Sequence, residues 1–130
     1  MNILGLSAIA IAKLIRDREL SALDVMAQTL QQAERVQHAL NPFVTIAWDQ
    51  AIEHAKRCDE RLLKGTPNDA AHLFGVPFTA KDLLNTFDLR TTYGSRAFET
   101  FQPKTDAVAI DRLRRAGAVL IGKTTTPEFA

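Results

Sequence analysis

The chain has 130 residues, and its 16 lysines and arginines nearly balance 15 aspartates and glutamates, for a formal net charge of +1. This length suits one domain that buries roughly two thirds of its unfolded surface, and its 46% hydrophobic content argues against disorder. The balanced charge gives no reason to expect nucleic acid or an anionic membrane as a partner. The single cysteine, Cys58, excludes an internal disulfide and fits a reducing compartment. Because the apolar run at 3–15 is too short to span a bilayer, we expect a soluble, cytoplasmic protein.

The first 42 residues predict two helices. Ser7 is a candidate N-cap for a short first helix. The apolar positions of that helix are Ile9, Leu14, Ile15 and Leu20. Ser21 and Asp24 form a clearer start signal for a second helix, which Asn41-Pro42 ends. Its apolar stripe consists of Leu23, Met26, Leu30, Ala33, Val36 and Leu40.

The middle of the chain predicts a strand, a helix and a loop. Residues 43–48 are rich in β-forming side chains, and Asp49 is a candidate cap for a helix that runs to Leu63. Its apolar face is Ala51, Ala55, Cys58 and Leu62. His54 and Cys58 are four residues apart, but two ligands do not make a metal site, so we interpret Cys58 as a small core residue. The composition of 64–70 is that of a loop.

The last third predicts two strands separated by an irregular segment and a helix. Residues 76–80 form the first strand, and 84–101 are irregular with a turn at Gly94-Ser95. Asp106 opens a helix that Gly117 ends. The run 118–121 is apolar at every position, as expected of a strand in a parallel sheet covered on both faces. The whole order of elements indicates an α/β fold.

One lysine has a sequence context that favours chemistry. Lys81 ends the mostly apolar strand at 76–80 and is followed at once by Asp82. Burial disfavours the charged form of a lysine, so such an amine can act as a general base. The alternative is that Lys81 reaches the surface and pairs with Asp82 or another acid.

Five segments favour the first interpretation through their order and spacing. They are Gly75-Val-Pro-Phe-Thr-Ala-Lys81-Asp82, Thr91-Thr-Tyr-Gly-Ser95, Asp106-Ala107, Leu113-Arg-Arg-Ala-Gly-Ala118 and Gly122-Lys-Thr-Thr-Thr-Pro-Glu-Phe-Ala130. Together they resemble the N-terminal part of the amidase signature family, whose members are serine hydrolases of carboxamides. These enzymes use a serine, a cis-serine and a lysine.

The resemblance implies a fold, a site and a set of partners. The fold is the N-terminal part of an α/β/α domain with helices packed on a mixed sheet, in which 1–130 is one segment, helical over 1–42 and α/β over 43–130. Lys81 falls at the position of the catalytic lysine. The implied substrate is a small-molecule amide, hydrolysed at its C–N bond with no cofactor and no metal. For the complete enzyme we expect no direct nucleic-acid partner and no membrane, and we consider a homodimer.

The sequence lacks a match to the family's glycine- and serine-rich signature. That signature carries the cis-serine, the oxyanion-hole amides and the nucleophile. Ser95 follows Lys81 but lies at a loop position of the family pattern, so we expect a turn hydroxyl there. We therefore expect 1–130 to be inactive alone, as the N-terminal segment of an amidase. The alternative is a non-catalytic module that folds with a partner, since its strands leave unpaired edges. Amino-acid amides, aryl amides, ureas and aminoacyl-tRNA amidation all remain open as substrates.

Further expectations concern the neighbours of Lys81. An ion pair to Asp82 would hold Lys81 charged, so we expect the Asp82 carboxylate to point toward backbone amides instead. Asp88 stands where the family usually has glycine, a position at which a positive φ is conceivable. For Lys123-Thr124, after the last apolar run, we favour a structural role over ligand binding.

Overall fold

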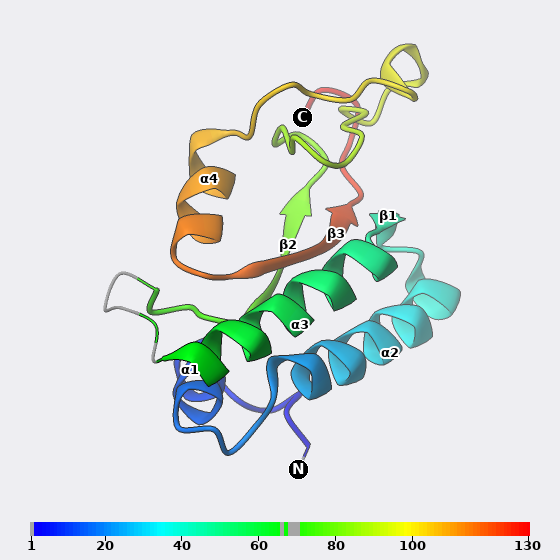
Figure 1. The fold of residues 1–130 in the computed structure, drawn as a ribbon. Coiled ribbons are helices and arrows are strands. Elements are labelled where there is room, and N and C mark those ends of the chain that lie inside the picture. The colour runs from blue at the N-terminus through cyan, green and yellow to red at the C-terminus, as the bar shows by residue number, and fades with distance from the viewer. Residues whose placement is uncertain (1, 66, 68–70) are drawn as a thin grey trace.

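The computed structural model describes residues 2–65, 67 and 71–130. In chain order, these residues form the elements α1, α2, β1, α3, β2, α4 and β3, with a short 3-10 helix at Arg96–Phe98 before α4 (Figure 1). The predicted loop at 64–70 lies mostly outside the described residues. Within them, no helix combines the length and the apolar character that crossing a bilayer demands.

A three-stranded mixed sheet lies at the centre of the fold. β3 (Val119–Thr124) is the middle strand, between β1 (Phe43–Ile46) and β2 (Pro77–Lys81). It pairs antiparallel with β1 and parallel with β2. Every residue of β3 before Thr124 is buried, as the continuous apolar run predicted. The expected α/β fold with a mixed sheet is confirmed.

Four helices surround this sheet. They are α1 (Ala8–Arg16), α2 (Ala22–Leu40), α3 (Trp48–Lys64) and α4 (Val108–Arg115). Figure 1 shows α2 and α3 side by side, with α4 on the other side of β2 and β3. The sheet is thus covered by α3 on one face and by α4 on the other.

The helix ends follow local chemistry that the sequence largely predicted. The Ser7 hydroxyl accepts a hydrogen bond from the Ala10 N–H at 3.2 Å, and the Ser21 hydroxyl accepts one from the Asp24 N–H at 2.9 Å. Asn41 ends α2 in the left-handed conformation, with φ of 49°.

Two predicted helix starts are wrong by one or two residues. α3 begins after Ala47 without a side-chain cap, and Asp49 lies in its first turn. α4 begins after Ala107. The Asp106 carboxylate instead accepts a hydrogen bond from the Phe87 N–H at 2.8 Å, which ties α4 to the irregular segment.

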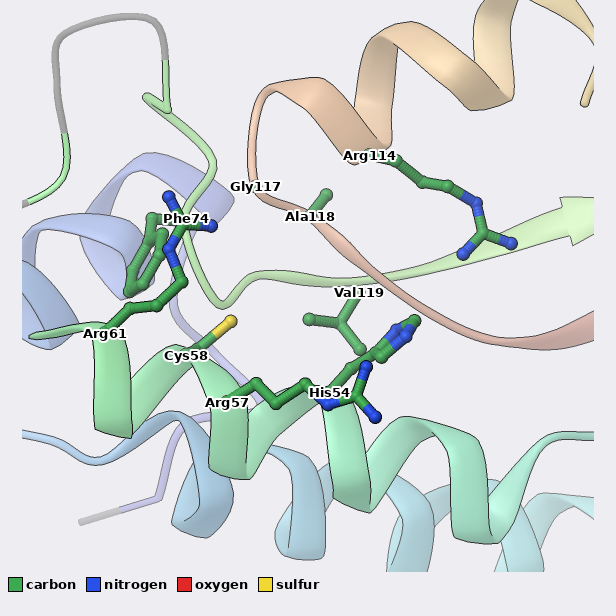
Figure 2. A pocket seen from close by; sticks show the side chains of 9 residues that line it. All are labelled: His54, Arg57, Cys58, Arg61, Phe74, Arg114, Gly117, Ala118 and Val119. Atoms are coloured by element: carbon green, nitrogen blue, oxygen red, sulfur yellow. The ribbon is translucent and has the colours of Figure 1, made fainter.

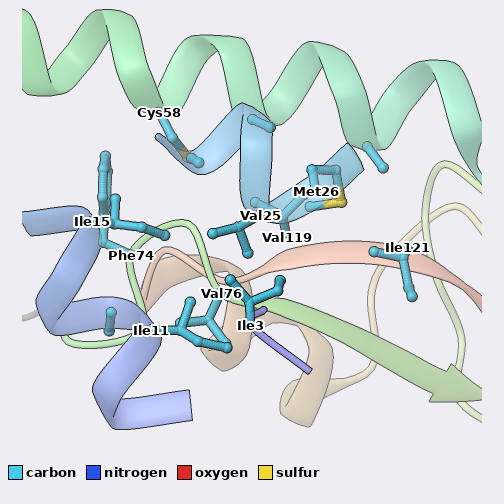
Figure 3. Close-up of a cluster of buried hydrophobic side chains, with 14 of the residues drawn as sticks. Ile3, Ile11, Ile15, Val25, Met26, Cys58, Phe74, Val76, Val119 and Ile121 are labelled. Carbon is cyan, nitrogen blue, oxygen red and sulfur yellow. The ribbon is translucent and has the colours of Figure 1, made fainter. Parts of the chain in front are cut away.

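The main apolar core lies between the sheet and the first three helices (Figure 3). The face of α3 is the one that its sequence predicted. Its buried residues are Ala51, Ala55, Cys58 and Leu62. α1 differs from the prediction, because Ile11 and Ile15 are buried while Ile9 is 78% exposed. A second core contains Ala47, Ala80, Leu89, Ile110 and Leu120, and it includes residues of α4 and the irregular segment.

A bulge in β3 changes which core its later residues face. Phe78 pairs with Leu120, whereas the next β2 residue, Thr79, pairs with Gly122, so Ile121 is the extra residue. Leu120 belongs to the second core and Ile121 to the main core. Beyond the bulge, Lys123 is the β3 partner of Ala80, a residue of the second core. A bulge of this kind redirects the side chains that follow it.

Candidate active site

Three of the five segments that the sequence singled out, 75–82, 91–95 and 122–130, meet at one edge of the sheet, whereas 113–118 lies at the opposite end, before β3. Since β2 and β3 are parallel, their carboxyl ends lie together, and ligands of α/β folds bind at this edge. The turn at 93–95 packs on the residues that follow β3. The Phe129 N–H donates to the Tyr93 carbonyl at 2.8 Å, and the Ser95 hydroxyl donates to the Glu128 carboxylate at 2.7 Å. Three separate stretches of sequence therefore form one continuous edge.

Lys81 is the last residue of β2, and its side chain is exposed. Successive residues of a strand point to opposite faces, and here Ala80 and Asp82 are buried while Lys81 is not. Among the described residues, no acidic side chain forms an ion pair with Lys81. The burial that the apolar run suggested is therefore not found within this chain. Lys81 therefore lies at the surface, as the second alternative predicted, but it does not form the ion pair with Asp82 that this alternative included.

Asp82 is fully buried, and its carboxylate binds groups other than the neighbouring Lys81. One carboxylate oxygen, Oδ2, accepts hydrogen bonds from the N–H of Thr92, at 3.1 Å, and from the Thr92 hydroxyl. The other oxygen lies 3.3 Å from the Nζ atom of Lys123. The expectation that this carboxylate binds a backbone amide is confirmed. Its ion pair with Lys123 was not predicted.

Lys123 is the buried lysine of this edge, with a side chain 0% exposed. Its Nζ atom donates to the carbonyl of Leu84 at 2.8 Å and to the hydroxyls of Thr86 and Thr91 at 3.2 and 2.7 Å. An ammonium group has three N–H donors, so these acceptors use all of them. Asp82 therefore interacts with the Lys123 ammonium through its negative charge and accepts no hydrogen bond from it.

The hydroxyl groups around Lys123 favour its charged form. Thr86 donates its hydroxyl proton to the Leu89 carbonyl at 3.0 Å, and Thr91 donates to the Leu84 carbonyl at 3.5 Å. Both hydroxyl oxygens therefore present lone pairs to Lys123. Burial lowers the pKa of Lys123, and the charge of Asp82 opposes that effect. The arrangement suits an ammonium ion held for structure, which agrees with the role we favoured for Lys123.

The sequence contains a signal for the burial of Lys123. Like Lys81, it follows an apolar run, here 118–121, and that run is the more hydrophobic of the two. The bulge and the strand alternation decide which of the two lysines is buried. Neither feature is visible in a hydrophobicity pattern.

Asp88 has an ionic role rather than a backbone one. Its φ is not positive, so the conformation considered from the sequence is not adopted. Its carboxylate accepts a hydrogen bond from the Arg114 guanidinium at 2.6 Å, and the same guanidinium lies 3.1 Å from Asp106. The irregular segment is thereby attached to α4.

A pocket of about 260 Å³ lies between α3 and the start of β3, at the end of the sheet opposite the carboxyl edge (Figure 2). Figure 2 shows His54, Arg57, Arg61 and Arg114 around it. Two of the arginines are in ion pairs with acidic side chains, and Arg61 lies over the ring of Phe74 at 5.5 Å. Among the arginines of this pocket, Arg61 forms no ion pair with a described residue, and Lys81 does not line the pocket.

Comparison with known proteins assigns this arrangement to a family. Residues 24–130 match the family described as Amidase. The chain belongs to the amidase family. It is 36% identical to a glutamyl-tRNA(Gln) amidotransferase polypeptide of Coxiella burnetii over 89% of the chain, and 39% identical to its counterpart in Methylococcus capsulatus over 87%. The resemblance inferred from the five segments is confirmed.

Solved amidase structures share the fold. Peptide amidase from Stenotrophomonas maltophilia superposes with a TM-score of 0.89 at 27% identity over 98% of this chain, and fatty acid amide hydrolase with 0.87 at 26% identity over 94%. The chain spans 26% and 21% of those two amidases and 23% of each curated relative. The chain thus corresponds to about a quarter of the length of these amidases.

Proposed function

We propose that these residues form the lysine-bearing part of an enzyme that hydrolyses carboxamides, with Lys81 as its catalytic lysine. The observation that carries the proposal is the different placement of two neighbours: Lys81 projects from the carboxyl edge of β2, while the Asp82 carboxylate is buried and bound elsewhere. Membership of the amidase family supports the reaction class.

The separation of Lys81 from Asp82 suits a general base. A carboxylate in contact with a lysine favours the ammonium form, which has no lone pair with which to accept a proton. Here the Asp82 carboxylate is bound by Thr92 and lies beside Lys123, so it makes no ion pair with Lys81. Covering of Lys81 by the rest of a longer enzyme would further favour the neutral amine.

The proposed reaction follows the lysine–serine–serine scheme of the family. Neutral Lys81 takes a proton from a cis-serine hydroxyl, which in turn deprotonates the nucleophilic serine. The serine attacks the amide carbonyl, the amine or ammonia leaves with a proton, and water hydrolyses the acyl-enzyme. The two serines and the N–H donors of the oxyanion hole come from residues outside this chain.

We expect the 130-residue chain alone to be inactive. Ser95, the serine that follows Lys81, donates its hydroxyl to Glu128 and is part of a turn. A lysine without nucleophile and oxyanion donors does not supply the roughly 8 kcal/mol or more by which enzymes lower their barriers.

The test is ammonia release by the complete protein that contains these residues. The panel includes amino-acid amides, a C-terminally amidated peptide, an aryl amide, a urea and glutamine, the last with and without glutamyl-tRNA and partner subunits. We expect turnover of at least one amide, and its loss by more than about a thousandfold in Lys81→Ala but not in Lys104→Ala, an exposed lysine. Lys81→Ala activity within tenfold of the parent would remove the assignment. A folded complete protein that releases no ammonia from any of them would favour the non-catalytic module.

A further inference from the structure

Lys123 joins two parts of the molecule that flank Lys81. It belongs to β3, yet its ammonium binds three acceptors in the irregular segment after β2 and faces the carboxylate of Asp82. The side chains of Lys123, Asp82, Thr86 and Thr91 are all fully buried. The catalytic scheme proposed above uses none of them.

We propose that Lys123 is a positioning residue for Lys81. Its buried ammonium fixes the chain immediately after β2 and keeps the Asp82 carboxylate turned away from the Lys81 amine. This inference rests on the proposed function, because Lys81 is the group whose position matters.

The hydrogen bonds around Lys81 show how the position is transmitted. The N–H of Asp82 donates to the Thr124 carbonyl at 2.9 Å, and the Lys81 carbonyl accepts from the Leu84 N–H at 2.9 Å. The carbonyl of Leu84 is in turn an acceptor for Lys123. The Lys123 ammonium therefore holds Leu84, and Leu84 in turn binds the carbonyl of Lys81 at the start of the turn.

The charge of Lys123 has a second effect. Without it, the Asp82 carboxylate would be buried next to no cation, which is unfavourable. The lysine adjacent in the chain, Lys81, would then be a ready counter-ion if the strand end rotated. Because Lys123 already neutralises the Asp82 carboxylate, that rotation brings no gain in ion pairing. The bulge at Ile121 places the Lys123 side chain on the face of the sheet where it reaches Asp82.

The decisive variant combines Lys123→Met with Asp82→Asn. Lys123→Met alone leaves an unpaired buried carboxylate and is expected to unfold part of the protein. Asp82→Asn removes that charge while keeping an oxygen to accept from Thr92, so the pair of changes restores folding without restoring the link to Leu84. Lys104→Met, at an exposed position, is the matched control.

The experiment measures turnover and amide hydrogen exchange in the complete protein, at a temperature where circular dichroism shows every variant folded. In the double variant we expect kcat to fall at least about tenfold with KM within about twofold, since Lys81 acts in the chemical step. Exchange of the Asp82 and Leu84 amides should rise at least about tenfold, while the Val119 amide, which donates to Val76, keeps its protection.

Three results would each overturn the inference, and the first two are a double-variant kcat within about threefold of the parent and unchanged exchange at Asp82 and Leu84. Failure of the proposed function is recognised separately, because it appears as activity retained in Lys81→Ala. A uniform rise in exchange that includes Val119 would show that Lys123 serves stability alone, and would also overturn the positioning role.

Discussion

Replacing Gly122 by alanine tests the tight approach of β1 to the bulged strand. A Cβ atom at this position would overlap the carbonyl oxygen of Thr45 and would lie 3.1 Å from the Cα atom of Ile46. Both neighbours are backbone atoms, so no side-chain rotation relieves the overlap. β1 must move away from β3.

The expected cost follows from that movement. Overpacking of this kind typically costs about 1–3 kcal/mol. Two backbone hydrogen bonds at the ends of β1 are strained as well, from the Ala47 N–H to Ile121 and from the Thr125 N–H to Pro42, both 2.8 Å long. Each contributes about 1 kcal/mol net when intact, so weakening both without breaking them adds about 1 kcal/mol. We expect Gly122→Ala to lower the free energy of unfolding by about 2–4 kcal/mol, a large share of the typical ~5–15 kcal/mol.

Urea denaturation followed by circular dichroism measures this loss. Gly5→Ala is the matched control, because a Cβ atom at Gly5 has no neighbour within 4 Å. Its stability should change by less than about 1 kcal/mol. If Gly122→Ala lowers the free energy of unfolding by less than about 0.5 kcal/mol, β1 does not pack as closely on β3 as described.

Two other changes address α3. The Asp59 carboxylate accepts hydrogen bonds of 2.7 and 3.0 Å from the first N–H groups of α2, so Asp59→Ala should destabilise the fold by about 2 kcal/mol in the same assay. Exposed Glu60→Ala should change stability by less than about 0.5 kcal/mol, and equal losses would contradict the capping role. Burial, with a smaller effect of Arg114, lowers the pKa of His54 below its ordinary 6.5. The unfolded chain then binds more protons, so stability should fall as pH drops below 6.5. His54→Gln should reduce this pH dependence, measured as the difference between the urea midpoints at about pH 8 and pH 5. An unchanged difference in His54→Gln would refute the assignment.

Local sequence chemistry predicted most of the elements because their signals act within a few residues. Ser7 and Ser21 cap their helices through hydroxyl groups three residues from the amides they bind. The face of α3 follows from the 3.6-residue period alone. The α3 start was misplaced because Asp49 resembles a cap, whereas tertiary pairing of Ala47 with β3 decides where the helix begins.

The candidate site was only half predictable for a different reason. The position of Lys81 at a strand end follows from its sequence, and so does the orientation of Asp82 toward amides. The burial of Lys123 depends on a bulge and on acceptors as far as 39 residues away in the chain. Such a contact leaves no periodic pattern, so the more hydrophobic run before Lys123 was the one sequence signal that distinguished the two lysines.

The order of strands in the sheet also has a consequence for how the protein is made. β3 is the middle strand, yet it follows β1 and β2 in the chain. As synthesis proceeds, Phe43 has no partner until Thr124 has left the ribosome. Contacts of such high sequence separation form slowly, and the unfinished strands are open to association in the meantime. Folding of the sheet therefore waits for β3, and a chain cut before Val119 would leave β1 and β2 without their shared partner strand and remove Val119 and Ile121 from the main core.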